Sequence, residues 1–256
     1  YISREGKLTR QHPPAHGRHV TNAGARHEHH ERAARQRFNM RRRDQAREAV
    51  PAQQLVDAIL PLAILQARKA GQGVILVSGH FGNYDVPRAV LDARGFKVGG
   101  LYRPFGNRYF NAHYRRTIGE ISQPVIPADD RKGLAEMIRF VRDGGMLGML
   151  IDVHSSKYPA FRFFNRTAPT ATSAADMALK YGLLLVPVYG LRLDDEGHYQ
   201  LIVEAPIAHS TAGEMTQALN DSLERQVRTH PEQWFWIHRR WKTNGRPPAD
   251  MPEQMT

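Results

Sequence analysis

A histidine and an aspartate five positions apart are the residues of this sequence best suited to chemistry. They lie in the segment Ser78-Gly79-His80-Phe81-Gly82-Asn83-Tyr84-Asp85. An aspartate at this spacing could accept the Nδ1 proton of the imidazole and leave the other ring nitrogen free as a base. Such a pair can deprotonate an alcohol without a covalent intermediate. The spacing by itself arises often by chance, so it leaves two interpretations open: His80 and Asp85 form a catalytic dyad, or His80 only caps a loop.

The residues before His80 predict where this pair lies. Residues 74–77 form a continuous apolar run between Gly73 and Gly79, which is typical of a buried strand. His80 would then stand at the carboxyl end of that strand, where open α/β sheets place their ligands. The neighbouring glycines would let the backbone turn sharply and let a substrate approach closely.

From residue 50 onward, short apolar runs alternate with amphipathic segments, which is typical of an α/β domain. Further strands are predicted over residues 98–102, 124–126, 146–151, 183–189 and 199–203. Two helix faces packed on a sheet are predicted from apolar residues at helical spacing, namely Leu134, Met137, Ile138 and Val141, and then Met215, Leu219, Leu223 and Val227.

The length and charge suggest one catalytic domain with appendages. A chain of 256 residues is long enough for one sizeable domain. Residues 1–50 contribute +7 of the net charge of +11 and almost no apolar face, so we predict a basic Arg/His-rich arm that is disordered or loosely held. We assign residues 51–246 to the catalytic domain and residues 247–256 to a frayed tail.

Two absences from the sequence narrow the possible classes of protein. There is no cysteine, which excludes disulfides, thiolate metal sites and a cysteine nucleophile. The longest apolar stretch, residues 55–65, is short and contains Asp57 and Pro61, so we expect the chain as given not to span a membrane. The first ten residues also lack the apolar region of a signal peptide.

Five short blocks occur in order along the chain and carry a family resemblance. They are Gly79-His80-Phe81-Gly82-Asn83-Tyr84-Asp85; Tyr102-Arg103-Pro104 with Asn107; Asp130-Arg131-Lys132-Gly133; Gly148-Met149-Leu150-Ile151-Asp152; and Trp236-Ile237-His238-Arg239-Arg240-Trp241-Lys242. In these blocks the sequence resembles the lipid A biosynthesis late acyltransferases, the lauroyl and myristoyl transferases. That family lies within the lysophospholipid and glycerol-3-phosphate acyltransferase superfamily, and the resemblance covers residues 73–242.

The resemblance implies a fold and an active site. The fold would be a mixed central sheet flanked by helices, as in glycerol-3-phosphate acyltransferases. The family's catalytic His-x4-Asp/Glu pair falls on His80 and Asp85. Arg103, Asn107 and Asp152 would line the acceptor site, although Arg103 could instead make a helix cap or a surface ion pair.

Arg116 is a possible counterpart of the family's phosphate-site arginine, a position for which the adjacent Arg115 competes. A guanidinium suits a phosphorylated sugar because it donates two parallel hydrogen bonds to phosphate oxygens.

The implied activity is transfer of a fatty acyl chain from acyl-acyl carrier protein to a hydroxyl of a lipid A-type phosphorylated glycolipid. No metal ion or bound organic cofactor is expected. The expected partners are acyl carrier protein, the glycolipid acceptor and anionic membrane lipid, with peripheral attachment at the cytoplasmic face of the inner membrane. A lysophospholipid, ornithine-lipid or mannoside acyltransferase is an alternative. A nucleic-acid partner is not expected, because most of the charge lies outside the patterned domain and there is no zinc-finger, RNP-type or helix-turn-helix signature.

The sequence departs from the family pattern in two places. An Arg/His-rich arm stands where family members usually have an apolar anchor and a helical region. Phe163-Phe164-Asn165-Arg166 stands where a Phe-Phe-Gly-Arg-like turn is expected. The aromatic and basic residues 234–242 suit either an interfacial belt or a late core element that ends near the active site.

Overall fold

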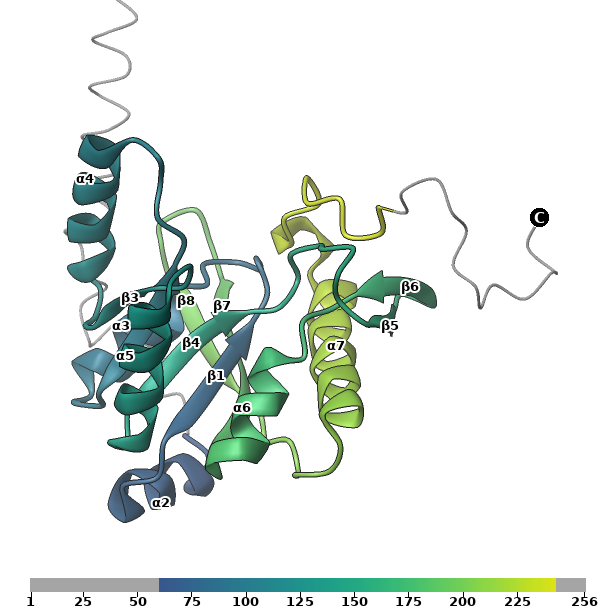
Figure 1. The fold of residues 1–256 in the computed structure, drawn as a ribbon. Helices are drawn as coiled ribbons and strands as arrows, with labels where there is room; N and C mark the ends of the chain where they lie inside the picture. Colours follow the sequence, from purple (N-terminus) through teal and green to yellow (C-terminus); the bar gives the residue numbers. More distant parts are fainter. Residues whose placement is uncertain (1–59, 243–256) are drawn as a thin grey trace, which may run out of the picture. The chain divides into compact units, whose positions relative to one another are not determined.

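A six-stranded sheet forms the centre of the computed structural model, which describes residues 60–242 (Figure 1). Its strands lie in the order β3 (Val125–Pro127), β2 (Val98–Tyr102), β4 (Met146–Leu150), β1 (Val74–Ser78), β7 (Leu184–Arg192) and β8 (Tyr199–Val203). All neighbouring pairs are parallel except β7 and β8, which are antiparallel. The predicted α/β fold with a mixed central sheet is therefore confirmed. The predicted basic arm and frayed tail lie outside the described residues.

Helices cover both faces of this sheet (Figure 1). They are α2 (Leu62–Ala70), α3 (Val86–Ala93), α4 (Arg108–Gly119), α5 (Arg131–Arg142), α6 (Ser173–Tyr181) and α7 (Ala212–Thr229), with a short 3₁₀ turn, η1 (Pro231–Gln233), after α7. Alternate residues of β1 point to opposite faces. Val74 and Leu76 pack with α2 and α3, whereas Ile75 and Val77 pack with α5, α6 and α7. All five residues of β1 are buried, as the continuous apolar run predicts.

The predicted strands occur at their predicted places, with ends displaced by up to three residues. One predicted helix contact is wrong. Leu134 is 50% exposed, and the face of α5 that packs on the sheet is made by Gly133, Met137 and Val141. A Cβ on Gly133 would lie 1.8 Å from the carbonyl oxygen of Pro127, so the absence of a side chain lets the first turn of α5 approach β3 closely.

A hairpin that the sequence did not predict lies beside α7. Its strands β5 (Ala160–Phe163) and β6 (Arg166–Pro169) are joined by Phe164 and Asn165, whose φ angles are 54° and 55°. Positive φ at both central residues is what a type I′ turn requires, and asparagine tolerates it well. The hairpin is tied to α7 by Gln217, which accepts from the Arg162 amide at 2.9 Å and donates to the Arg162 carbonyl at 3.0 Å. The Phe-Phe-Asn-Arg departure thus forms an ordered turn.

Candidate active site

His80 stands just beyond the carboxyl end of β1 and forms a hydrogen-bonded pair with Asp152. Its Nδ1 lies 2.7 Å from Asp152 Oδ1, and its amide donates to Asp152 Oδ2 at 2.8 Å. The indole Nε1 of Trp234 also donates to Oδ2, at 3.0 Å. The Asp152 side chain is fully buried, whereas that of His80 is 21% exposed. The carboxylate is therefore held from several directions, and the imidazole keeps an open edge.

The parallel register of two central strands brings this pair together. Ser78 at the end of β1 lies opposite Leu150 at the end of β4, so the residues two positions further on, His80 and Asp152, lie side by side. Gly79 makes the approach possible, because a Cβ there would lie 2.7 Å from Leu223 and 3.0 Å from Asp152 Oδ2. The two chemically important residues are 72 positions apart in sequence and adjacent in the fold.

The surroundings of Asp152 keep it ionised. Burial opposes the charged form, but the hydrogen bonds and charge of His80 and the bond from Trp234 outweigh it, so the pKa of the carboxyl lies below its ordinary value. An ionised carboxylate can only accept a hydrogen bond, which places the proton of a neutral imidazole on Nδ1. The lone pair is then on Nε2, the nitrogen that acts as a base.

Asp85 does not fill the position predicted for it. Its carboxylate accepts a hydrogen bond from Arg88 Nη1 at 2.9 Å, and Nδ1 of His80 is held by Asp152 instead. Asp85 immediately precedes α3, so Arg88 lies one turn along on the same side of the helix. Burial raises the pKa of Asp85, and Arg88 offsets this only in part. The predicted contact between Asp85 and His80 is therefore wrong.

Arg88 ties Asp85 to the middle of the sheet. It is only 9% exposed, and besides Asp85 it donates to the hydroxyl of Ser122 at 3.2 Å and to its carbonyl oxygen at 3.3 Å. The side chain lies across glycines of β2 and β4: a Cβ on Gly100 would be 2.7 Å from its Cζ, and one on Gly148 would be 3.4 Å from its Cδ. Asp85 and Arg88 thus form a structural ion pair under the loop that carries His80.

A late segment of the chain is fastened to the His80 loop. The amide of Gly82 donates to the carbonyl of Gln233 at 2.8 Å, and the amide of Phe235 donates to the carbonyl of His80 at 2.9 Å. Gly82 has a φ of +52°, and a Cβ there would lie 2.1 Å from the carbonyl oxygen of Gly190 on β7. The aromatic block that begins at Trp234 therefore lies beside the predicted base, as one of its two interpretations requires.

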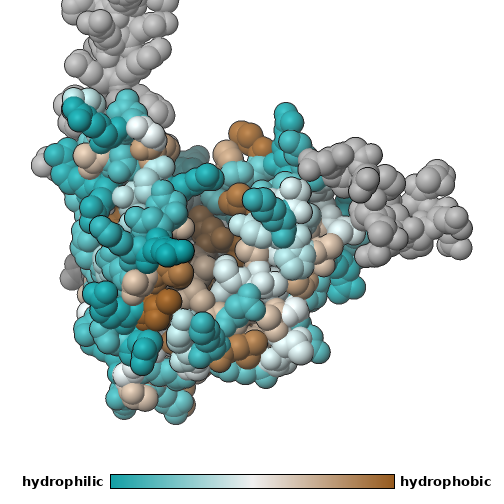
Figure 2. Space-filling view, viewed as in Figure 1, coloured by the Kyte–Doolittle hydropathy of each residue, from teal (hydrophilic) through white to brown (hydrophobic). Residues whose placement is uncertain are grey.

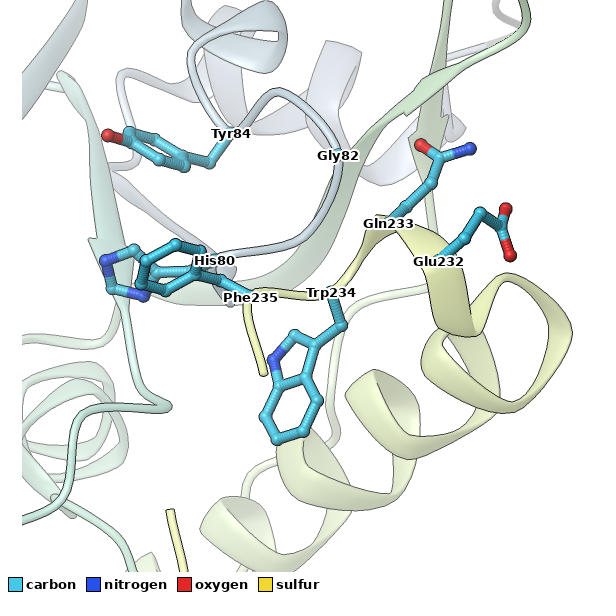
Figure 3. A pocket seen from close by; sticks show the side chains of 7 residues that line it. All are labelled: His80, Gly82, Tyr84, Glu232, Gln233, Trp234 and Phe235. Atoms are coloured by element: carbon cyan, nitrogen blue, oxygen red, sulfur yellow. The ribbon is translucent and has the colours of Figure 1, made fainter. Parts of the chain in front are cut away.

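An open cavity of about 360 Å³ lies between the loop and this segment. In Figure 3 the phenol of Tyr84 and the ring nitrogens of His80 point to the same side, whereas Glu232 and Gln233 point away from them. The cavity is lined by His80, Gly82, Tyr84, Glu232, Gln233, Trp234 and Phe235. A partly exposed imidazole at the edge of an open cavity, with its other nitrogen fixed by a buried carboxylate, has the geometry of a general base for an incoming hydroxyl.

Comparison with known proteins places this geometry in a family. A family model described as bacterial lipid A biosynthesis acyltransferase matches residues 23–243. The chain belongs to this family. The resemblance predicted from the five blocks is confirmed, and the match begins within the segment predicted to be a basic arm.

Two curated relatives have names that refer to lipid A biosynthesis. The chain is 31% identical over 190 residues to the lipid A biosynthesis lauroyltransferase of Escherichia coli (strain K12), which covers 70% of this chain and 58% of that protein. It is 24% identical over 195 residues to the lipid A biosynthesis acyltransferase 2 of Shigella flexneri, covering 72% of this chain and 60% of that protein. The matched region thus spans less than two thirds of the length of either relative.

Three of the residues predicted from the family pattern to line an acceptor site lie on the segment after β2 and on α4. Arg103 is exposed just after β2. Asn107 caps α4, its Oδ1 accepting from the amides of Tyr109 at 3.0 Å and Phe110 at 3.1 Å. Arg116 is exposed in the last turn of α4. None of Arg103, Asn107 and Arg116 lines the cavity beside His80, and their roles in binding stay predictions.

The sequence prediction missed two partners of His80. Asp152 was expected to line the acceptor site and instead holds the imidazole. His238 was named only as part of the late block, yet its ring centroid lies 4.4 Å from that of His80. The signal for Asp152 was present in the sequence, because it follows a second predicted strand in the same way that His80 follows the first.

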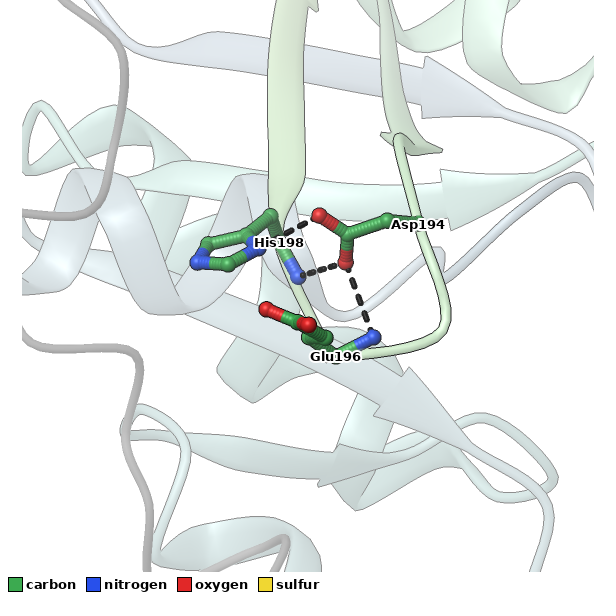
Figure 4. Close-up of side chains that lie close together, drawn as sticks. All are labelled: Asp194, Glu196 and His198. Carbon is green, nitrogen blue, oxygen red and sulfur yellow. Dashed lines mark hydrogen bonds and ion pairs between the residues drawn. The ribbon is translucent and has the colours of Figure 1, made fainter.

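A second group of polar residues lies at the turn between β7 and β8 (Figure 4). It consists of Asp194, Glu196 and His198. Asp194 Oδ1 accepts from the amides of Glu196 at 2.9 Å and His198 at 3.1 Å, and Oδ2 lies 2.5 Å from His198 Nδ1. These bonds, first of all the one from the His198 amide, lower the pKa of the Asp194 carboxyl. The carboxylate thus organises the hairpin turn, and we assign this group to the local structure.

Proposed function

We propose that this chain transfers an acyl group from a thioester donor to a hydroxyl of a lipid A-type phosphorylated glycolipid, with His80 as the general base and Asp152 as the residue that orients it. The observation that carries the proposal is the 2.7 Å contact between His80 Nδ1 and the buried Asp152 carboxylate at the edge of an open cavity. Family membership favours this reaction over other uses of a His–Asp pair.

The reaction proceeds by direct transfer. Nε2 of His80 takes the proton of the acceptor hydroxyl as that oxygen forms a bond to the acyl carbonyl carbon, whose oxygen becomes negative. When the carbonyl re-forms, the carbon–sulfur bond breaks and the thiolate takes the proton from the His80 imidazolium. Asp152 stabilises the imidazolium through Nδ1 while it exists. These steps use no metal ion and no bound organic cofactor.

The proposed donor is an acyl-acyl carrier protein, which the family resemblance implies.

Within this scheme the ion pair formed by Asp85 and Arg88 has a structural role. Because Asp85 ends the loop that begins at His80, its bond to Arg88 fixes the far end of that loop to Ser122 and the sheet. Loss of this ion pair would loosen the loop without removing the base.

We propose further that the protein attaches peripherally to an anionic lipid surface, at the cytoplasmic face of the inner membrane, through α4 and the loop before it. Residues 103–119 contain four arginines and no acidic residue. No residue of α4 is buried, and Tyr109, Phe110 and Phe105 are 73%, 49% and 45% exposed. Aromatic rings at headgroup depth beside arginines that reach phosphates are typical of interfacial segments. Among the helices of residues 60–242, none is long and apolar enough to cross a membrane.

The surface around the sheet's carboxyl edge is compatible with this arrangement. In Figure 2 the face shown is hollowed in the middle, with apolar residues at the bottom of the hollow and polar residues around it. A hollow of this kind could admit an acyl chain while the charged rim contacts headgroup phosphates. Since β2 leads directly into the loop before α4, the arginine-rich segment and His80 lie at the same edge of the sheet.

An acceptor and donor panel tests the proposed function. The full chain would be incubated with a phosphorylated lipid A precursor, a lysophospholipid and an ornithine lipid, each with acyl-carrier and coenzyme A thioesters. We expect transfer to the lipid A precursor, faster from the carrier protein, and its loss in His80→Ala. Transfer only to a lysophospholipid would favour the alternative acyltransferase. Undiminished transfer by His80→Ala would refute the assigned site.

A further inference from the structure

Three backbone amides of the His80 loop are already engaged within the protein. The amide of His80 donates to Asp152 Oδ2 at 2.8 Å, that of Gly82 to the Gln233 carbonyl at 2.8 Å, and that of Asn83 to the Gly190 carbonyl at 2.9 Å. Acyl transfer develops negative charge on the carbonyl oxygen, which preorganised donors must stabilise. These three amides could serve that oxygen only by breaking bonds that hold the loop, which favours a side-chain donor.

His238 is placed to supply such a donor. Its ring centroid lies 4.4 Å from that of His80, with 62° between the ring planes, and 4.8 Å from that of Phe235. Three backbone hydrogen bonds hold the segment that carries His238. The Phe235 amide donates to the His80 carbonyl at 2.9 Å, the His238 amide to the Phe235 carbonyl at 3.2 Å and the Arg240 amide to the His238 carbonyl at 2.7 Å. The second imidazole therefore has a defined position beside the first.

The surroundings of His238 favour its neutral form. Burial and the charge of His80 lower the pKa of His238, and Asp152 opposes them more weakly. Tyr84, whose ring lies 5.5 Å from that of His80, and Phe235 complete the group of rings around the two histidines. A neutral imidazole keeps one N–H donor and adds no positive charge beside the imidazolium that His80 becomes during the reaction.

We propose that His238 is a catalytic residue that donates a hydrogen bond from its neutral imidazole to the oxygen of the acyl carbonyl. This inference rests on the proposed function. As the acceptor oxygen bonds to the carbonyl carbon and His80 takes its proton, the carbonyl π electrons move to the oxygen that His238 contacts. When the carbon–sulfur bond breaks they return, and the proton on His80 leaves with the thiolate. His238 keeps its own proton throughout.

Two substitutions separate this role from simple ring packing. His238→Phe keeps an aromatic ring against His80 and Phe235 but removes the donor, whereas His238→Gln keeps an N–H donor and removes the ring. Each would be measured for kcat, KM and melting temperature with an acyl-carrier thioester and a lipid A precursor. The same two substitutions at His209, whose Nε2 contacts the Leu183 carbonyl at 2.8 Å on another part of the fold, provide the matched control.

We expect His238→Phe to lower kcat by about 100- to 1,000-fold with little change in KM or melting temperature, the usual effect of losing one oxyanion donor. His238→Gln should retain kcat within about tenfold of the unaltered chain, and neither His209 variant should change kcat. Normal turnover by His238→Phe, or equal losses in both His238 variants, would overturn the donor role. If the unaltered chain transfers nothing, the proposed function itself fails, an outcome distinct from an active chain that is indifferent to position 238.

Discussion

Replacing Asp152 with asparagine should invert the tautomer of His80. Oδ2 of Asp152 accepts from the His80 amide and from Trp234 Nε1, so the asparagine oxygen will stay on that side to satisfy both donors. Its NH₂ group then faces Nδ1 of His80, which must become the acceptor. In the neutral imidazole the proton would move to Nε2, the nitrogen that has to receive the acceptor's proton.

The size of the effect follows from this inversion. A base whose lone pair is on the wrong nitrogen, in an otherwise unchanged site, loses on the order of 10⁴-fold in kcat. This corresponds to about 5 kcal/mol of transition-state stabilisation. The fold should lose far less, about 1 to 3 kcal/mol, because the two bonds to Oδ2 are kept and only charge-assisted strength is lost. Catalysis and stability should therefore separate clearly in Asp152→Asn.

The effect of Asp152→Asn on the free energy of unfolding should also depend on pH. Since the pKa of Asp152 is lower in the folded protein than its ordinary value of 3.8, its ionisation stabilises the fold above pH 3.8 and ceases to do so as the pH falls through the folded pKa. The difference in unfolding free energy between the unaltered chain and Asp152→Asn should shrink below about pH 4. Urea unfolding at several pH values measures this.

Kinetics with a lipid A precursor and an acyl-carrier thioester would decide the assignment. His80→Ala, Asp152→Asn and the double variant should be almost equally impaired, because the two residues act as one unit. Asp85→Asn is the matched control, a partly buried carboxylate in the same motif that contacts Arg88 instead. If Asp85→Asn proves as severe as His80→Ala while Asp152→Asn is mild, the orienting role of Asp152 is refuted.

Three further predictions concern the rest of the domain. Asp85→Asn and Arg88→Met should each lower stability, with a coupling energy of about 1 kcal/mol in a double-mutant cycle. Each should reduce kcat by at most about tenfold. Additive effects of the two substitutions on the urea midpoint would contradict the ion pair. Replacing Arg108 and Arg115 with glutamine should weaken cosedimentation with anionic vesicles by roughly 30-fold, from about 1 kcal/mol per arginine, and unchanged binding would exclude α4 as the contact. Arg240→Met should reduce the unfolding free energy by about 3 kcal/mol, because the fully buried guanidinium bonds Thr170 at 2.6 Å; an unchanged urea midpoint would show that these bonds contribute little.

The sequence alone determined the layers of the fold and the position of the base. Residues 74–77 are apolar on both faces of the strand, a pattern that only a strand buried between helices satisfies, and the structure buries all of β1. Because His80 follows this strand after a single glycine, its place at the carboxyl edge of the sheet could be predicted. Local pattern was sufficient here, since strand burial and the position of a strand end depend on neighbouring residues.

The local sequence pattern did not predict features that depend on side-chain packing or on contacts between distant parts of the chain. The spacing of Leu134 favoured a buried side chain, yet the close approach of α5 to Pro127 puts Gly133 on the packed face. The β5–β6 hairpin has only four residues in each strand, and its packing on α7 depends on Gln217, some fifty residues away. Neither outcome follows from hydrophobic periodicity.

The partner of His80 was decided only by tertiary structure. A carboxylate five positions away in sequence was the natural choice. However, α3 begins directly after Asp85, and the Asp85 carboxylate pairs with Arg88 in the first turn of that helix. Asp152 reaches His80 because β1 and β4 are neighbours in parallel register, although β2, β3 and three helices separate them in the chain. Strand order is set by the packing of the whole sheet, so which strand ends meet cannot be deduced from the residues around either one.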